Sequence, residues 1–113
     1  MTSHNADRAW AQIPMPDWLF NAWKAYAVSI DQEQRQVLDI FVREYIDAKE
    51  SSDGTKHVLF YAAVRSAKGR SVQLDANLYK KTQGFADKHE TRVNRVLMTA
   101  VIDGLKNRNK IDV

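Results

Sequence analysis

The chain has 113 residues, is 44% hydrophobic and carries a formal net charge of +3, so it can bury one modest core. It contains no cysteine, which excludes disulfide frameworks, thiolate nucleophiles and cysteine-based zinc sites. No apolar run approaches the roughly 18 residues of a membrane span, and the first residues lack the order of a signal peptide. We therefore expect one domain, located in the cytoplasm and without membrane contact.

The charge is distributed unevenly along the chain. Residues 1–50 carry five Lys and Arg against eight Asp and Glu, whereas residues 51–113 carry twelve against six. The first half therefore has a net charge of −3 and the second half of +6. An anionic partner such as a phosphate backbone is expected to bind mainly to the second half, although a solvated basic face is the alternative.

Residues 9–20, AWAQIPMPDWLF, predict a short strand closed by Pro16 and followed by a helix whose first residues are acidic and aromatic. All three tryptophans lie in the first 23 residues. Trp23 follows Leu19 by four residues, which favours a core position. Trp10 and Trp18 are expected to be partly exposed, where they belong either to the surface of the fold or to a binding surface for a protein partner.

Residues 51–68 form a connector that begins with a flexible Ser-Ser-Asp-Gly run and continues as an apolar segment. Helical spacing of Val58, Tyr61, Ala62 and Arg65 predicts a helix, which Gly69 ends. A strand is the alternative, because residues 58–61 are rich in β-forming side chains.

Residues 70–75, RSVQLD, alternate polar and apolar side chains, which predicts a half-buried strand. Helical spacing then predicts a helix from Asn77 and a second helix from Arg92 to about residue 106. Thr91 precedes the second helix and is predicted to cap it. The apolar positions that share one helix face are Leu78, Phe85 and Ala86 in the first helix and Val93, Val96, Leu97, Ala100, Val101 and Leu105 in the second.

The order of a strand, a helix, a tight turn and a helix over residues 69–108 resembles the bacterial ribbon-helix-helix, or Arc/MetJ-like, DNA-binding proteins. In that family two strands pair antiparallel into a ribbon that lies in the major groove, above a core of paired helices. Val72 and Leu74 match the inward strand positions of the family. The resemblance implies a sequence-specific DNA-binding protein, such as a transcriptional repressor or a plasmid nucleoprotein accessory factor, and not an enzyme.

The resemblance also implies the site residues. The outward strand positions that read bases in the family match Ser71 and Gln73, and a carboxamide can pair with adenine N6 and N7. The family binds DNA phosphates at the N-terminus of its second helix, where free N–H groups and the helix dipole attract anions. The corresponding phosphate-binding candidates are Arg92, Val93, Asn94 and Arg95, together with the basic residues Lys68 and Arg70 beside the strand.

The first half repeats the apolar pattern of the second half at a gapless offset of 59 residues. Eleven apolar pairs coincide over residues 13–47, where the composition gives roughly seven by chance. This predicts a first, degenerate ribbon-helix-helix repeat over residues 8–50, with Trp10 and Gln12 facing outward and Gln12 as its base-reading candidate. Two features depart from the family pattern: Pro14 cannot donate a ladder hydrogen bond, and the turn at residues 31–35 is acidic.

Tandem repeats allow two arrangements. Residues 9–15 and 70–75 can pair within one molecule, which gives a monomeric pseudodimer similar to some conjugative-plasmid relaxosome accessory proteins. Alternatively, two copies of residues 70–75 pair across a homodimer, and residues 1–50 form a separate helical module. We expect the pseudodimer.

Sequence motifs for catalysis are not found. His4, His57 and His89 have no metal-site spacing, and neither a glycine-rich phosphate loop nor a nucleophile elbow is present. We therefore expect no cofactor and no enzymatic activity. The alternative to a DNA-binding regulator is a protein-interaction module such as an antitoxin. Antitoxins of this family usually place the DNA-binding unit first, whereas here the recognisable unit comes last.

Overall fold

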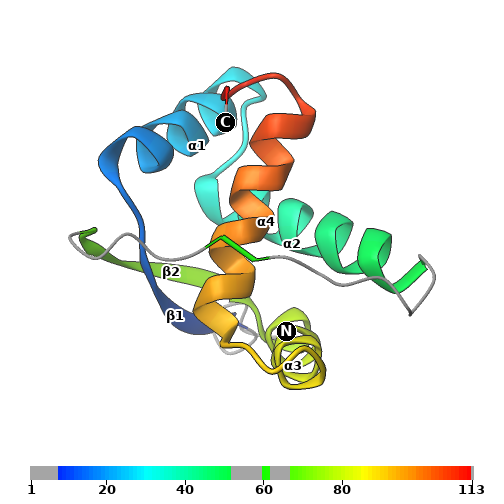
Figure 1. Cartoon of the computed structure of the whole chain (residues 1–113). Coiled ribbons are helices and arrows are strands. Elements are labelled where there is room, and N and C mark those ends of the chain that lie inside the picture. The colour runs from blue at the N-terminus through cyan, green and yellow to red at the C-terminus, as the bar shows by residue number, and fades with distance from the viewer. Residues whose placement is uncertain (1–7, 52–59, 62–66, 113) are drawn as a thin grey trace, which may run out of the picture.

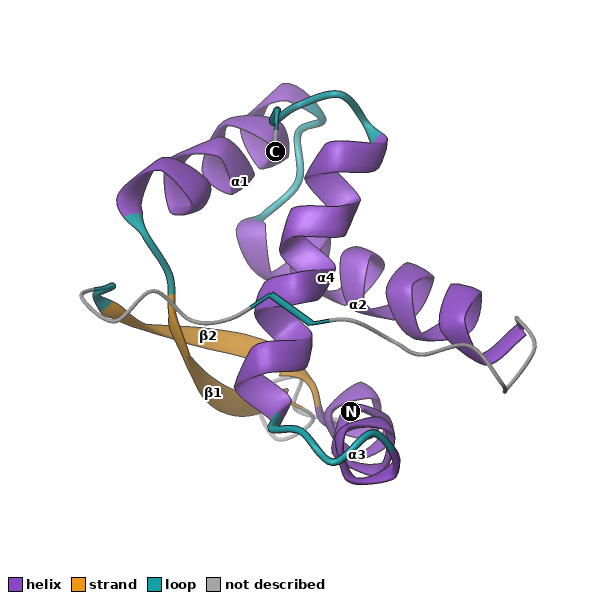
Figure 2. Cartoon of the chain, viewed as in Figure 1, coloured by secondary structure: helices purple, strands orange, loops and turns teal. Residues whose placement is uncertain are grey.

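The computed structural model describes residues 8–51, 60–61 and 67–112, in which a strand and two helices are followed by a second strand and two helices (Figure 1). The prediction of a mainly helical chain with a short two-stranded antiparallel ribbon is confirmed (Figure 2). Within these ranges no helix is long and apolar enough to cross a membrane. The elements are β1 Arg8–Pro14, α1 Asp17–Ser29, α2 Gln34–Ser51, β2 Gly69–Asp75, α3 Ala76–Lys88 and α4 Val93–Asn107.

The ribbon is formed within one chain. β1 and β2 pair antiparallel along their whole lengths, from Arg8 opposite Asp75 to Pro14 opposite Gly69. Pro14 lies at the end of the ladder, where its missing N–H costs least. Val72 and Leu74 are buried, so the prediction that they face inward is confirmed.

The core lies beneath the inner face of the ribbon. α2 and α4 pack against each other, with α2 also against β2 and α4 against β1. α1 and α3 lie on opposite sides of this central pair (Figure 1). The predicted core position of Trp23 is confirmed, and its indole Nε1 donates to the carbonyl oxygen of Gln34 at 3.1 Å. The largest fully buried side chains are Trp23, Phe41, Ile13, Met15, Leu19, Leu38, Ile46, Leu74, Leu97 and Leu105, with Val37 and Val42.

The two halves have the same local geometry at the offset of 59 residues. This offset places α1 on α3 over their whole lengths and the first residue of α2 on that of α4. It also places Asp31 on Glu90, which have positive φ angles of 57° and 55°. Each of these residues lies in a Schellman-type turn, closed by Gln32 N–H to Ala27 in one half and Thr91 N–H to Ala86 in the other, both at 2.9 Å.

Two helix starts differ from the sequence predictions. The Asp75 carboxylate accepts from the N–H of Leu78 at 3.0 Å, so Asp75 caps α3 and the helix begins at Ala76. The prediction that Thr91 caps the next helix is wrong, because Thr91 closes the turn after α3 and the N-cap of α4 is Arg92.

Most of the connector lies outside the described residues. Phe60 and Tyr61 belong to neither a helix nor a strand, and the remaining positions of the predicted connector helix, including Val58, Ala62 and Arg65, are not described. The described pair nevertheless contacts the core region, because the N–H of Tyr61 donates to the Thr99 hydroxyl at 3.0 Å and Phe60 packs edge-on against Phe85.

Candidate nucleic-acid interface

The outer face of the ribbon carries the residues that the sequence predicted to read bases. Strand alternation turns Ala11, Val72 and Leu74 toward the helices, so the intervening positions face outward. Gln12 and Ser71 are exposed on this face and Gln73 is half-buried. The structure therefore brings Gln12, Ser71 and Gln73 together on one surface.

The register gives the ribbon a local two-fold axis. Gln12 lies opposite Ser71 in the ladder, and these two residues also correspond at the offset of 59. A residue and its counterpart in the other half can face each other only where the two-fold axis passes between them. The axis therefore passes between Gln12 and Ser71, at the middle of the outer face.

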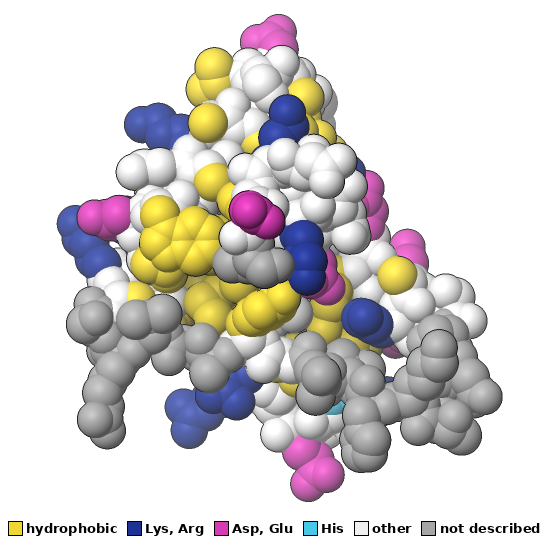
Figure 3. Space-filling view, turned by 45° about the horizontal axis from the view of Figure 1, so that its top comes forward, with side chains coloured by type: hydrophobic (Ala, Val, Ile, Leu, Met, Phe, Trp, Pro, Cys, Tyr) yellow, Lys and Arg dark blue, Asp and Glu magenta, His cyan; other side chains and the backbone are white. Residues whose placement is uncertain are grey.

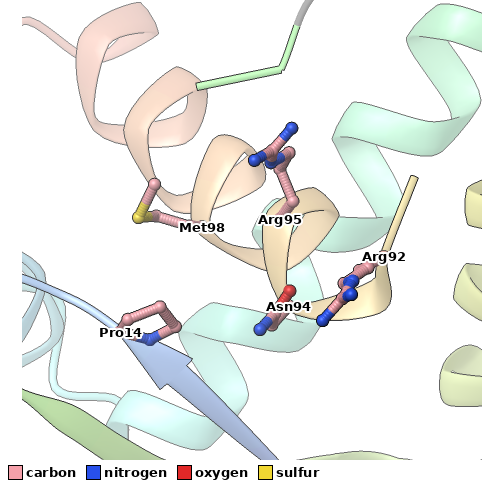
Figure 4. A pocket seen from close by; sticks show the side chains of 5 residues that line it. All are labelled: Pro14, Arg92, Asn94, Arg95 and Met98. Carbon is pink, nitrogen blue, oxygen red and sulfur yellow. The ribbon is translucent and has the colours of Figure 1, made fainter. Parts of the chain in front are cut away.

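The N-terminus of α4 lies beside one end of the ribbon. Its N-cap, Arg92, makes no side-chain capping hydrogen bond, and the N–H groups of Val93 and Asn94 have no acceptor among the described residues. A cavity of about 300 Å³ separates this helix start from β1. Figure 4 shows Arg92 and Asn94 on one side of this cavity and Pro14 on the other. It is lined by Pro14, Arg92, Asn94, Arg95 and Met98.

The charges at this helix start are not neutralised within the described part of the chain. Arg92 and Arg95 are exposed, and neither side chain forms an ion pair or a hydrogen bond with another described residue. Free backbone N–H groups, the positive end of the helix dipole and two arginines are the groups that bind phosphate at helix N-termini. The predicted phosphate-binding residues of α4 are thus adjacent, and neither of their two arginine side chains is paired with a described acidic side chain.

The corresponding start of α2 differs in its side chains, although the N–H groups of Gln34 and Arg35 also have no acceptor among the described residues. The side-chain oxygen of Gln36 accepts from the N–H of Glu33 at 2.9 Å, as in a capping box. Arg35 forms an ion pair with Glu33 at 2.6 Å. Because a carboxylate already lies beside the positive end of the helix dipole, this helix start is a poor site for a phosphate.

The two basic candidates at the start of β2, Lys68 before the strand and Arg70 within it, have different surroundings. The side chain of Arg70 is 15% exposed, donates to the carbonyl oxygen of Met15 at 3.2 Å and pairs with Asp17. It also stacks over the ring of Phe20, with 4.2 Å between the guanidinium carbon and the ring centroid. Lys68 is exposed, and its carbonyl oxygen accepts from the N–H of Met15. Arg70 is therefore engaged in structural contacts, whereas Lys68 remains available to a ligand.

Arg35 is a residue of this surface that the sequence reasoning missed. Its Nη1 lies 3.5 Å from Oε1 of Gln73, at the limit of a hydrogen bond. The start of α2 therefore reaches the outer face of the ribbon, next to a predicted base reader. The offset of 59 places Arg35 on Asn94, which is the signal that identifies this position.

Trp10 lies opposite Gln73 in the ladder and is 66% exposed, and Trp18 is 51% exposed, which confirms that both are partly exposed. A shallow hollow of about 270 Å³ beside Trp10 extends to the start of α2. The hollow is open to solvent and is part of the outer surface of the ribbon. Its lining residues are Trp10, Phe20, Trp23, Gln34, Arg35, Ser71, Val72 and Gln73.

Among residues 8–51, 60–61 and 67–112, no group of three or more His, Cys, Asp or Glu side chains is placed to hold a metal ion. Comparison of the chain with protein-family models, curated proteins and solved structures finds no match.

Proposed function

We propose that the protein is a sequence-specific DNA-binding protein that inserts its antiparallel ribbon in the major groove of double-stranded DNA. The observation that carries the proposal is the outer face of the ribbon, where Gln12, Ser71 and Gln73 are presented together above a buried inner face. The role is that of a bacterial transcriptional repressor or of an accessory factor in a plasmid nucleoprotein complex, in the cytoplasm.

The dimensions and chemistry of the ribbon support this proposal. A two-stranded ribbon fits the width of the major groove, where each base pair presents a distinct set of donors and acceptors. The carboxamides of Gln12 and Gln73 can pair with adenine, and the hydroxyl of Ser71 can donate to or accept from any base. These three side chains are proposed to read the sequence.

Phosphate contacts are proposed for the candidates around the start of α4 and for Lys68. Arg92, Asn94 and Arg95, the N–H groups at Val93 and Asn94, and Lys68 surround one end of the ribbon. Such contacts set the orientation of a protein on the duplex without reading its sequence. Arg70 is left out of this set, because its guanidinium is covered and paired with Asp17.

The proposed arrangement is that of a tandem ribbon-helix-helix protein in one chain. Residues 8–50 and 69–108 are proposed as the two repeats, joined by the connector of residues 51–68. Support comes from the shared bounds of α1 and α3, the shared start of α2 and α4, the repeated turns at Asp31 and Glu90, and the pairing of β1 with β2. Sedimentation of the full chain at micromolar concentration tests this arrangement, since a pseudodimer has the mass of one chain, 13.0 kDa.

A titration of the full chain with specific and random duplexes at several salt concentrations tests DNA binding. Gln73→Ala is expected to reduce the preference for the specific duplex by about tenfold, because it removes base contacts. Arg92→Ala is expected to weaken binding to both duplexes and to flatten the salt dependence, because it removes a phosphate contact. Lys106→Ala is the control, since Lys106 lies at the opposite end of α4. Equal behaviour of the Gln73 and Arg92 variants on both duplexes contradicts this division of roles.

A second candidate function is a protein-interaction module, such as an antitoxin bound to a toxin. The observation that favours it is the exposure of large apolar side chains on α1, where Trp18 is 51% and Val28 is 73% exposed. Figure 3 shows hydrophobic side chains gathered on one face of the molecule, with Lys and Arg side chains around them. Co-purification with a protein partner together with no retardation of any duplex supports this function instead.

A further inference from the structure

We propose that the DNA site is asymmetric, with base-specific contacts from Trp10 and Gln73 concentrated in one half-site and phosphate contacts concentrated in the other. The inference rests on the proposed DNA-binding function and goes beyond it by describing the kind of site that the ribbon recognises.

The outer face of the ribbon differs between its two ends. The offset of 59 relates Trp10 to Gly69 and Pro14 to Gln73. The ladder pairs Trp10 with Gln73 and Pro14 with Gly69. Both large side chains therefore lie at one end, which we call the reading end, and both residues without a base-reading group lie at the other, the anchoring end.

The chemistry of the reading end suits a base step that contains A·T pairs. The exposed face of Trp10 can contact a thymine methyl group, and the carboxamide of Gln73 can pair with an adjacent adenine. Arg35 approaches Oε1 of Gln73 and so favours one orientation of this carboxamide. A carboxamide oxygen has two lone pairs, so Oε1 can still accept from adenine N6.

The anchoring end cannot read bases in the same way. Gly69 has no side chain, and the ring of Pro14 has no donor or acceptor. The side chain of Gln12 extends alongside Gly69, because a Cβ added at Gly69 would lie 3.6 Å from Cδ of Gln12. Ser71 therefore reads a base pair near the two-fold axis. The carboxamide of Gln12, which reaches alongside Gly69, is the one base-reading group that a described side chain of the outer face extends toward the anchoring end, against Trp10 and Gln73 at the reading end.

The charges show the opposite asymmetry. At the anchoring end, Arg70 is paired with Asp17, but Lys68, Arg92 and Arg95 form no ion pair with another described residue. At the reading end, Arg8 is paired with Asp39 at 2.8 Å and Arg35 with Glu33 at 2.6 Å. Phosphates are attracted most strongly where cations have no acidic partner, so the backbone is held mainly beside Pro14 and Gly69.

Selection of duplexes from a random pool by the full chain tests the inference. We expect an enriched site with strong base preferences, including A·T pairs, on one side of its centre and weak preferences on the other. Two palindromes are then built, one from each half of the enriched site. Because one end of the ribbon carries the reading residues, the palindrome of the strongly preferred half is expected to bind no better than the parent site.

Substitutions at positions related by the two-fold axis provide matched controls. Trp10→Ala and Gln73→Ala are each expected to reduce discrimination in the strongly preferred half-site by about tenfold. Their counterparts, Gly69→Ala and Pro14→Ala, are expected to leave the base preferences of both half-sites unchanged. The Cβ added by Gly69→Ala meets only ordinary van der Waals distances, of 3.6 Å or more, so this control is expected to fold.

The outcomes distinguish the inference from the proposed function. A selected site with equal preferences in its two halves, or equal effects of Gln73→Ala and Pro14→Ala, overturns the asymmetry and leaves DNA binding intact. A pool with no enriched sequence and no salt-dependent retention overturns the proposed function and the asymmetry together.

Discussion

The ring of Phe41 in α2 lies against the backbone of Gly104 in α4, so that a Cβ added at position 104 would lie 2.5 Å from Cγ and 2.7 Å from Cε1 of that ring. These distances are shorter than side chains tolerate. Phe41 is buried and belongs to the core between α2 and α4, so it cannot move without displacing other residues. The absence of a side chain at Gly104 thus sets how closely the two central helices approach.

Gly104→Ala is therefore expected to destabilise the protein by about 1–2 kcal/mol, since overpacking a core costs more than the helix propensity that alanine adds. Unfolding in urea measures the change. Gly84→Ala in α3 is the control, because a Cβ there meets no atom within 4 Å, and it is expected to stabilise by about 0.5–1 kcal/mol. The same change in stability for both variants contradicts the close contact with Phe41.

The ion pair between Arg8 and Asp39 holds one end of the ribbon on α2. Oδ2 of Asp39 lies 2.8 Å from Nη1 of Arg8, and Oδ1 accepts from the N–H of Asp75 at 3.1 Å. Asp39→Ala leaves a largely buried guanidinium and a ladder-end N–H without their acceptor. We expect a loss of about 2–4 kcal/mol in the free energy of unfolding.

The control for this pair is an exposed one. Asp47 lies 3.2 Å from Lys81 at the surface, and Asp47→Ala is expected to cost less than about 1 kcal/mol. Urea unfolding measures both variants, and similar losses in the free energy of unfolding would contradict the structural role of the pair between Arg8 and Asp39.

The hydroxyl of Tyr45 is buried and has no hydrogen-bond partner among the described residues. Tyr45→Phe is therefore expected to stabilise the protein by about 1 kcal/mol, because it removes an unsatisfied polar group. The matched variant is Tyr26→Phe, which is expected to destabilise, since the hydroxyl of Tyr26 accepts from Nε of Arg108 at 2.9 Å. Thermal unfolding of both variants compares the two signs, and a destabilised Tyr45→Phe variant refutes the prediction.

Burial, and to a lesser extent the charge of Asp103, raises the pKa of Tyr45. A folded-state pKa above the unfolded value means that the folded state retains a proton that the unfolded state loses. Stability therefore falls as the pH rises through about 10, the ordinary tyrosine value. This part of the alkaline loss is expected to be absent in the Tyr45→Phe variant.

Burial also raises the pKa of Asp103, although Lys49 and Lys106 act in the opposite direction. The folded state then binds the proton more tightly than the unfolded state, so stability falls as the pH rises from the ordinary aspartate value through the folded-state pKa, above which the loss is complete. Asp103→Asn is expected to stabilise the protein at neutral pH. The gain should shrink as the pH falls below the ordinary aspartate range, and unfolding at neutral pH and at about pH 3 checks both parts.

The sequence was sufficient to predict the elements that repeat a local pattern. Period-two alternation identified the strand with Val72 and Leu74, and helical spacing identified the buried faces of the helices, because these patterns depend on near neighbours. The cap of α4 was predicted wrongly at Thr91, since the turn after α3 uses Glu90 at positive φ without a glycine to mark it.

The charged residues of the site were harder to predict, because their partners are distant in sequence. Arg70 is a reasonable phosphate-binding candidate by position, but folding places it against Asp17, 53 residues away. The repeat offset marks the position of Arg35 but not its partner, because only the packing of α2 against β2 brings it to Gln73, 38 residues away. Local patterns contain no information on such pairs.

Because both strands belong to one polypeptide, dilution does not separate them. Two separate chains must meet before they can share a ribbon, so their pairing is lost when the protein becomes scarce. Here β1 and β2 remain tethered, and their effective concentration is set by the chain between them instead of by the number of molecules in the cell. A surface assembled in this way is complete in a single molecule, even at very low abundance.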